Sequence, residues 1–216
     1  MKKFFPVLLL IFFCACSSSR NVQESFRSDT IDFNSIQNSK ITVCGVSNIS
    51  LGDFGYYTSN EYSDTSKLNS KILSTICEKF NTLIPSVISV EMDGSIPSFL
   101  TNEYSSNNYT SEETSAFFNN LGTDYLMLID SLNVSKVQNS HRFEMRSGAF
   151  MTTFEEICEV NIEVELWDAM RQEKIIVFKA AADESINEHK YFEALDAAID
   201  KTVNDAVMFI KNDGKL

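Results

Sequence analysis

Acidic side chains recur at alternate positions late in the chain, and they are the first candidates for chemistry. Glu159, Glu163 and Glu165 alternate with apolar residues, and paired carboxylates can bind a cation or exchange protons in catalysis. Residues two apart on a strand, however, lie roughly 7 Å apart on one face. We therefore interpret these residues as the solvated face of a strand rather than a catalytic pair.

Other residue types that support catalysis or metal binding do not form a recognisable set. The two histidines, His141 and His189, have no ligand neighbour at metal spacing. The chain has no nucleophile-elbow, phosphate-loop or zinc-helix motif, and its many serines lack a plausible base. The sequence thus predicts no catalytic residue, no metal site and no cofactor, so we expect a protein that is not an enzyme.

One cysteine, Cys16, lies in a sequence pattern that predicts its modification. Two lysines precede a short apolar run, which ends in Ala15 and Cys16. A membrane-spanning helix needs about 20 apolar residues, so this run is too short to span a bilayer. The pattern is typical of a bacterial lipoprotein signal, in which residues 1–15 are removed and Cys16 is acylated.

The lipid on Cys16 would decide where the protein resides. Each buried CH₂ contributes about 0.8 kcal/mol, so two or three acyl chains form a stable anchor. Ser17 follows the anchor, which favours onward transport to the outer membrane. The alternative is ordinary secretion with cleavage nearby. With the lipid anchor we expect a protein of the bacterial cell envelope.

The net charge of the mature chain limits the classes of partner that it can bind. Without residues 1–15, which hold two lysines and no acid, 16 basic residues face 30 acidic ones. This balance argues against nucleic acid as a partner and against a basic face that docks on anionic lipid. Membrane attachment is therefore expected through the N-terminal lipid anchor alone.

Three further cysteines, Cys44, Cys77 and Cys158, lie within apolar segments. Their odd number and long spacings indicate neither a disulfide framework nor a zinc site. We expect buried free thiols, and one bridge among the three is the alternative.

The elements expected to carry these residues follow from hydrophobic periodicity. Residues 16–39 are polar without a sustained period and predict a flexible tether, and a single domain is expected over 40–213. Its strands are expected at 40–46, 87–90, 124–137, 151–167 and 175–178, and its helices near 66–84, 111–121 and 195–210. The order β-α-β-α-β-β-β-α predicts an α/β (α+β) fold, a mixed sheet with an antiparallel meander and helices packed on it.

Two tyrosine-containing loops are the candidate binding surface. Residues 59–63 and 101–105 are near copies, and each lies in a loop that leaves an early strand. Parallel strands would bring both loops to one sheet edge, where such folds bind partners. The tyrosines expected to contact a partner are Tyr56, Tyr57, Tyr62, Tyr104 and Tyr109. The alternative is two unrelated polar loops.

A family resemblance appears at residues 117–128, where a helix ends in Leu121 and Gly122 and a strand begins at Asp124. This passage resembles small envelope lipoproteins of the LpoB and curli-secretion (CsgG) kind, which share a fold with the TolB N-terminal domain. Residues 164–169 resemble the end of a later strand in the same proteins. The resemblance implies the same fold from about residue 40 to 211.

Three functions are compatible with these features. The first is a non-enzymatic outer-membrane lipoprotein whose domain binds an envelope protein partner or forms a homo-oligomer. The second is a subunit of an oligomeric secretion channel of the curli type, with the hairpin between Val134 and Leu166 as a membrane strand pair. Charged and polar residues would interrupt its lipid-facing band, namely His141, Arg142, Glu144, Arg146 and Glu155. A hydrolase is the third.

Overall fold

The computed structural model describes residues 21–58, 62, 64–87, 89–93, 112–145 and 147–215. The expected signal sequence, Cys16, Tyr104 and Tyr109 lie outside the described residues. The strands are β1 (Asn21–Arg27), β2 (Lys40–Ser50), β3 (Ser89–Asp93), β4 (Tyr125–Glu144), β5 (Phe150–Asp168) and β6 (Glu173–Ser185). The helices are α1 (Phe33–Gln37), α2 (Phe54–Tyr57), α3 (Thr65–Leu83), α4 (Glu112–Leu121) and α5 (Tyr191–Lys211).

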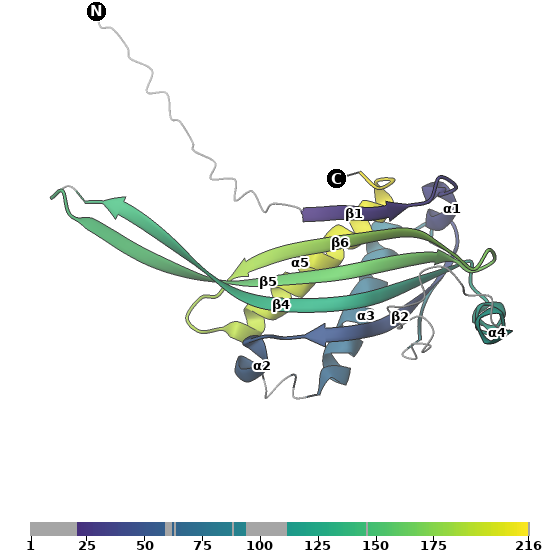
Figure 1. The fold of residues 1–216 in the computed structure, drawn as a ribbon, viewed down its shortest axis with the longest axis horizontal. Helices are drawn as coiled ribbons and strands as arrows, with labels where there is room; N and C mark the ends of the chain where they lie inside the picture. The colour runs from purple at the N-terminus through teal and green to yellow at the C-terminus, as the bar shows by residue number, and fades with distance from the viewer. Residues whose placement is uncertain are drawn as a thin grey trace, which may run out of the picture.

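The strands form one mixed sheet in the order β1-β6-β5-β4-β2-β3 (Figure 1). β2 pairs in parallel with β3 and β4, whereas β4, β5 and β6 form an antiparallel meander. The parallel pairs require crossover connections, which contain the helices. The predicted α+β fold with a mixed sheet and a meander is therefore confirmed.

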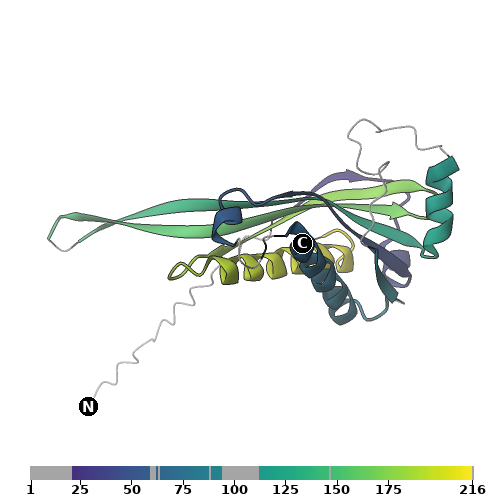
Figure 2. The same ribbon diagram turned by 90° about the horizontal axis from the view of Figure 1, so that it is seen from below.

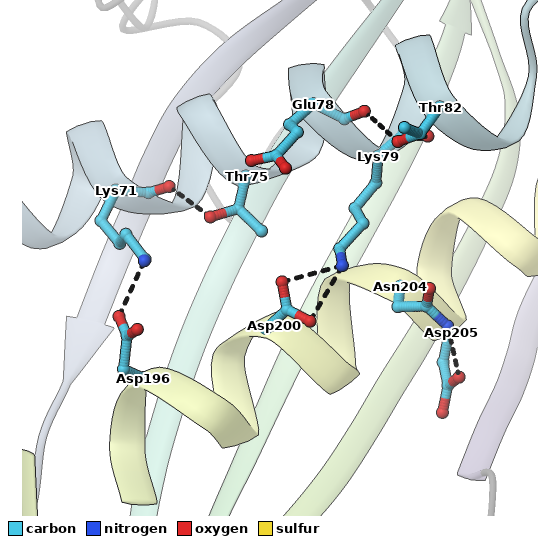
Figure 3. Close-up of polar contacts among 9 residues, drawn as sticks. All are labelled: Lys71, Thr75, Glu78, Lys79, Thr82, Asp196, Asp200, Asn204 and Asp205. Carbon is cyan, nitrogen blue, oxygen red and sulfur yellow. Dashed lines mark hydrogen bonds and ion pairs between the residues drawn. The ribbon is translucent and has the colours of Figure 1, made fainter. Parts of the chain in front are cut away.

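Two long helices cover one face of the sheet, as Figure 2 shows for α3 and α5. The apolar stripe of α5 meets the alternating apolar residues of β5 and β6, whereas that of α3 packs on β2 and on α5. Together these side chains form the main core. Two ion pairs also join the helices at 2.9 Å, Lys71 with Asp196 and Lys79 with Asp200 (Figure 3). Such partly exposed pairs contribute only about 0–1 kcal/mol, so apolar packing holds the helices in place.

The other face of the sheet carries a smaller core at one end. Phe118 of α4 packs against Trp167 of β5, with ring centroids 6.0 Å apart. Cys44, Leu126, Leu128 and Ala169 complete this cluster. The helix ends as predicted, because Gly122 has the left-handed conformation (φ 66°) that favours glycine after a helix.

The prediction that residues 16–39 form a tether is wrong for the part from residue 21 onward. β1 pairs with β6 from Asn21 to Arg27, and Phe33 of α1 packs edge-on against Phe209 of α5. Ile36 is fully buried. The apolar residues of this segment are too sparse to show a period, and they are ordered by partners far away in the sequence. The domain therefore begins before residue 40.

β2 also extends beyond the predicted strand, past an irregularity at Gly45. There the Asn69 side chain of α3 accepts a hydrogen bond from the Val46 amide at 2.9 Å. A Cβ atom at residue 45 would lie 2.6 Å from Asn69 Nδ2, so glycine allows this close approach of helix and strand.

Candidate functional site

Strands β4 and β5 continue well beyond the rest of the sheet. β2 leaves β4 at Asn133, and β6 leaves β5 at Ile157. Residues 138–156, here called the arm, are thereafter paired only with each other, and they project from the body in Figures 1 and 2. Gly148 (φ 77°) allows the tight turn at the tip, where Met145 N–H donates to the Ala149 carbonyl at 2.7 Å.

The arm exposes a concentration of large apolar side chains. Five of them are between 45% and 65% exposed: Phe143, Met145, Phe150, Met151 and Phe154. Phe143 pairs directly with Met151, so these two share one face, whereas Phe150 and Phe154 lie on the other. Apolar side chains gathered on a projecting element mark an interaction surface more often than a solvated one.

Charged side chains accompany these apolar residues. The Arg142 guanidinium lies 4.1 Å from the centroid of the Phe150 ring, in cation–π geometry. Farther from the tip, His141 faces Glu155 at 3.4 Å. Hydrogen bonds from Ser185 and from His141 lower the pKa of Glu155, so this carboxylate stays charged at neutral pH.

The root of the arm is held by a set of aromatic and charged contacts. Tyr57 of α2 stacks on Tyr191 of α5 with ring centroids 4.0 Å apart. The Tyr191 hydroxyl donates to Glu156 at 3.1 Å, and Lys136 pairs with the same carboxylate at 3.2 Å. The hydrogen bond from Lys136, followed by that from Tyr191, lowers the pKa of Glu156. Through Glu156 these contacts attach the arm to α5, and Tyr191 of α5 in turn stacks on α2. Together they fix the direction of the arm.

The structure divides the predicted tyrosine surface. Tyr56 is exposed on α2, and Tyr57 belongs to the root of the arm. Tyr62 is buried against Phe192, with ring centroids 5.4 Å apart. Tyr62, one of the tyrosines expected to contact a partner, is thus covered by the apolar surface of α5 and is not part of an exposed tyrosine surface.

Two of the three candidate glutamates of β5 form ion pairs with lysines rather than a pair with each other. Glu163 lies 3.2 Å from Lys179, and Glu165 lies 2.5 Å from Lys174. This geometry agrees with the solvated-face interpretation. Within the described part of the chain, no group of three His, Cys, Asp or Glu residues could hold a metal ion.

Cys44, Cys77 and Cys158 form no disulfide with one another in the structure, and Cys44 and Cys158 are buried while Cys77 is partly exposed. Burial, followed by the nearby carboxylates of Glu184 and Glu159, raises the pKa of Cys158 to about 12. A thiol with this pKa stays protonated and is a poor nucleophile. None of the helices in the described ranges is long and apolar enough to cross a membrane.

Sequence reasoning missed the arm aromatics as a site. It predicted the hairpin but treated its charged residues as the informative ones. The usable signal was the presence of Phe143, Phe150 and Phe154 in a segment that is otherwise polar.

Comparisons with known proteins give only weak similarities to solved structures. No family model matches the chain, and no curated protein matches it. A PelC dodecamer from Paraburkholderia phytofirmans is 10% identical with a TM-score of 0.41, over 86% of this chain and 96% of that one. A neuraminyllactose-binding hemagglutinin homolog from Helicobacter pylori is 11% identical with a TM-score of 0.40, over 89% and 92%. Lipoprotein GNA1162 from Neisseria meningitidis is 11% identical with a TM-score of 0.27, over 77% and 99%.

Proposed function

We propose that this chain is a lipid-anchored protein of the bacterial outer membrane that binds another envelope protein through its arm and catalyses no reaction. The observation that carries the proposal is the set of five exposed apolar side chains on a projecting hairpin. Cys16 would carry the lipid, and the domain would present the arm to its partner.

The composition of the arm supports a protein as its partner. Aromatic residues, methionine and arginine are enriched at the centres of protein–protein interfaces, and the arm combines three phenylalanines with two methionines and Arg142. Its root contacts also fix its direction before binding, which lowers the entropy that association must overcome.

The resemblance to LpoB, CsgG and the TolB N-terminal domain is part of this proposal. The residues that carry it, 117–128, form the end of α4, the Gly122 turn and the start of β4. This helix–turn–strand arrangement is what the resemblance implied, and it supports an envelope role of the same kind.

The proposal predicts the effect of removing two rings from the arm. Phe143→Ser combined with Phe150→Ser should abolish capture of the partner, because truncating a hot-spot residue costs about 2 kcal/mol or more. Thermal unfolding should change little, since both side chains are more than half exposed. Chemical crosslinking in cells, followed by mass spectrometry, measures the recovered partner.

The matched control is Met170→Ser, which removes an even more exposed apolar side chain (89%) from the turn between β5 and β6. This variant should retain the wild-type partners. Recovery of every wild-type partner by the arm variant would refute the proposal.

A second candidate is a subunit of an oligomeric secretion channel of the curli type, which uses the same hairpin in the membrane. The projection of β4 and β5 from the body favours it. The His141–Glu155 pair, midway along the arm, would then face lipid or a pore. The two candidates differ in what surrounds the arm, which is protein in the first and lipid in the second.

A further inference from the structure

The sheet has a hollow where the arm joins the body, lined in part by Ile157 and Glu159. These residues alternate along β5 with Cys158 and Val160 of the main core, so the hollow lies on the face opposite α3 and α5. This root hollow measures about 150 Å³, and its lining includes Val137, Ile157 and Ala181. Glu159 and Asp183 also line it, and they are direct partners across β5 and β6. A space of this size can hold one benzene ring. The root hollow therefore combines room for an aromatic ring with two carboxylates.

These carboxylates are available to a cation from outside. Among the described residues, Glu163 and Glu165 each form an ion pair with a lysine. Glu159 and Asp183 take part in no ion pair between described residues. Glu159 accepts hydrogen bonds only from neutral side chains, Ser135 at 3.4 Å and Asn161 at 3.2 Å. The root hollow thus favours a ligand that joins a ring to a positive charge.

The tip of the arm has this chemistry. Arg142 lies directly over the Phe150 ring, and both side chains are exposed. Residues 141–151 hold two arginines and one glutamate, whereas the whole chain has a formal charge of −12. The tip therefore presents a cation beside an aromatic ring, on a molecule that is negative overall. Opposite potentials of this kind steer two surfaces together and fix their register.

The arm cannot reach its own root hollow. The eight residue pairs from Val137 to Glu144 form a continuous antiparallel ladder, which places the tip roughly 25 Å away. A contact between tip and root must therefore join two molecules. The contact is either reciprocal, in a two-fold dimer in which each arm enters the root hollow of the other copy, or head-to-tail, which generates a ring or an open chain.

We propose that the partner of the arm is a second copy of this chain, whose root hollow receives Phe150 while Arg142 faces its Glu159 and Asp183. This inference rests on the proposed function, because it names the protein that the arm binds. Each copy then places its arm in the root hollow of another copy and receives an arm in its own.

Charge reversal tests this pairing. Arg142→Glu or Asp183→Arg alone should raise the dissociation constant for self-association at least about tenfold, because like charges then meet. An equimolar mixture of the two variants should recover the wild-type value, since each reversed charge finds its opposite on the other variant. Sedimentation of the full-length protein in detergent measures the association, and thermal unfolding verifies that each variant is folded.

Asp29→Arg is the control, because it makes the same charge change at an exposed site just after β1. The end of β1 pairs with Ile176, at the end of β6 away from the arm. It should leave self-association unchanged. Arg142→Ser provides a milder variant of the tip, which should also weaken association. A wild-type protein that stays monomeric, or a folded mixture that fails to reassociate, would overturn the inference. A further outcome separates the two proposals. If the chain does not self-associate but the arm variants lose a different protein partner in cells, the proposed function stands and this inference is wrong.

Discussion

Phe178→Ala should lower the free energy of unfolding by about 3–5 kcal/mol, the usual loss for a large aromatic side chain in a core. Phe178 of β6 is completely buried, and its ring lies 4.6 Å from that of Phe209 on α5. Phe209 also contacts Phe33 of α1, so the cavity would reach the N-terminal segment. Urea unfolding measures the change. Small domains have only about 5–15 kcal/mol of stability, so the effect is a large share of the total.

Two control variants test whether the loss of stability comes from the cavity in the core rather than from the removal of a phenylalanine as such. Phe178→Leu keeps most of the volume and should lose less than about 1.5 kcal/mol. Phe26→Ala removes the same ring from β1, where it is 45% exposed, and should change stability by no more than about 0.5 kcal/mol. Equal losses at Phe26 and Phe178 would contradict the core described for this sheet.

Phe118→Ala should cost roughly 3 kcal/mol and loosen α4. Phe118 is 3% exposed and is the α4 residue that packs on Trp167 in the smaller core. That cluster has few members, so little packing remains once the ring is removed. Trp167 is the only tryptophan of the chain, so its fluorescence should shift to longer wavelength as the indole gains contact with water.

The control for this variant is Asn120→Ala on the same helix, where the side chain is exposed. It should leave both the stability and the emission of Trp167 unchanged. An unshifted emission in the Phe118→Ala protein would show that α4 does not depend on this contact.

Local sequence patterns predicted the main helices and strands, because the hydrophobic period of each element lies within one short segment of the chain. The stripe from Leu68 to Phe80 and the alternation from Cys158 to Leu166 each bury one face, and both appear in the sequence as a regular period. β1 and α1 have no such period. Their order depends on β6 and on Phe209, and these partners are too distant in sequence for a local pattern to show.

The site was less predictable than the fold, because it depends on where the sheet stops. The residue type at positions 143 and 150 does not show whether the side chain is exposed or buried, because phenylalanine occurs in both places on strands. Their exposure follows from the ends of β2 and β6, which leave β4 and β5 unaccompanied. The burial of Tyr62 has the converse cause, since the helix that covers it begins about 130 residues later.

The arm and the body can therefore be tested separately. Phe178 and Phe118 support the fold, while the exposed arm residues contribute little to it. A variant that loses a partner without losing stability would assign the function to the arm.

The most direct test places a photoreactive amino acid at Met151 on the arm and, as a control, at Met170 in the turn between β5 and β6. Met151 is 50% exposed and Met170 is 89% exposed, so exposure alone would favour the control. The proposed function predicts that illumination of cells gives defined protein adducts from position 151 and far fewer from position 170. Lipid adducts at position 151, or no more protein adducts there than at position 170, would contradict a protein-binding arm.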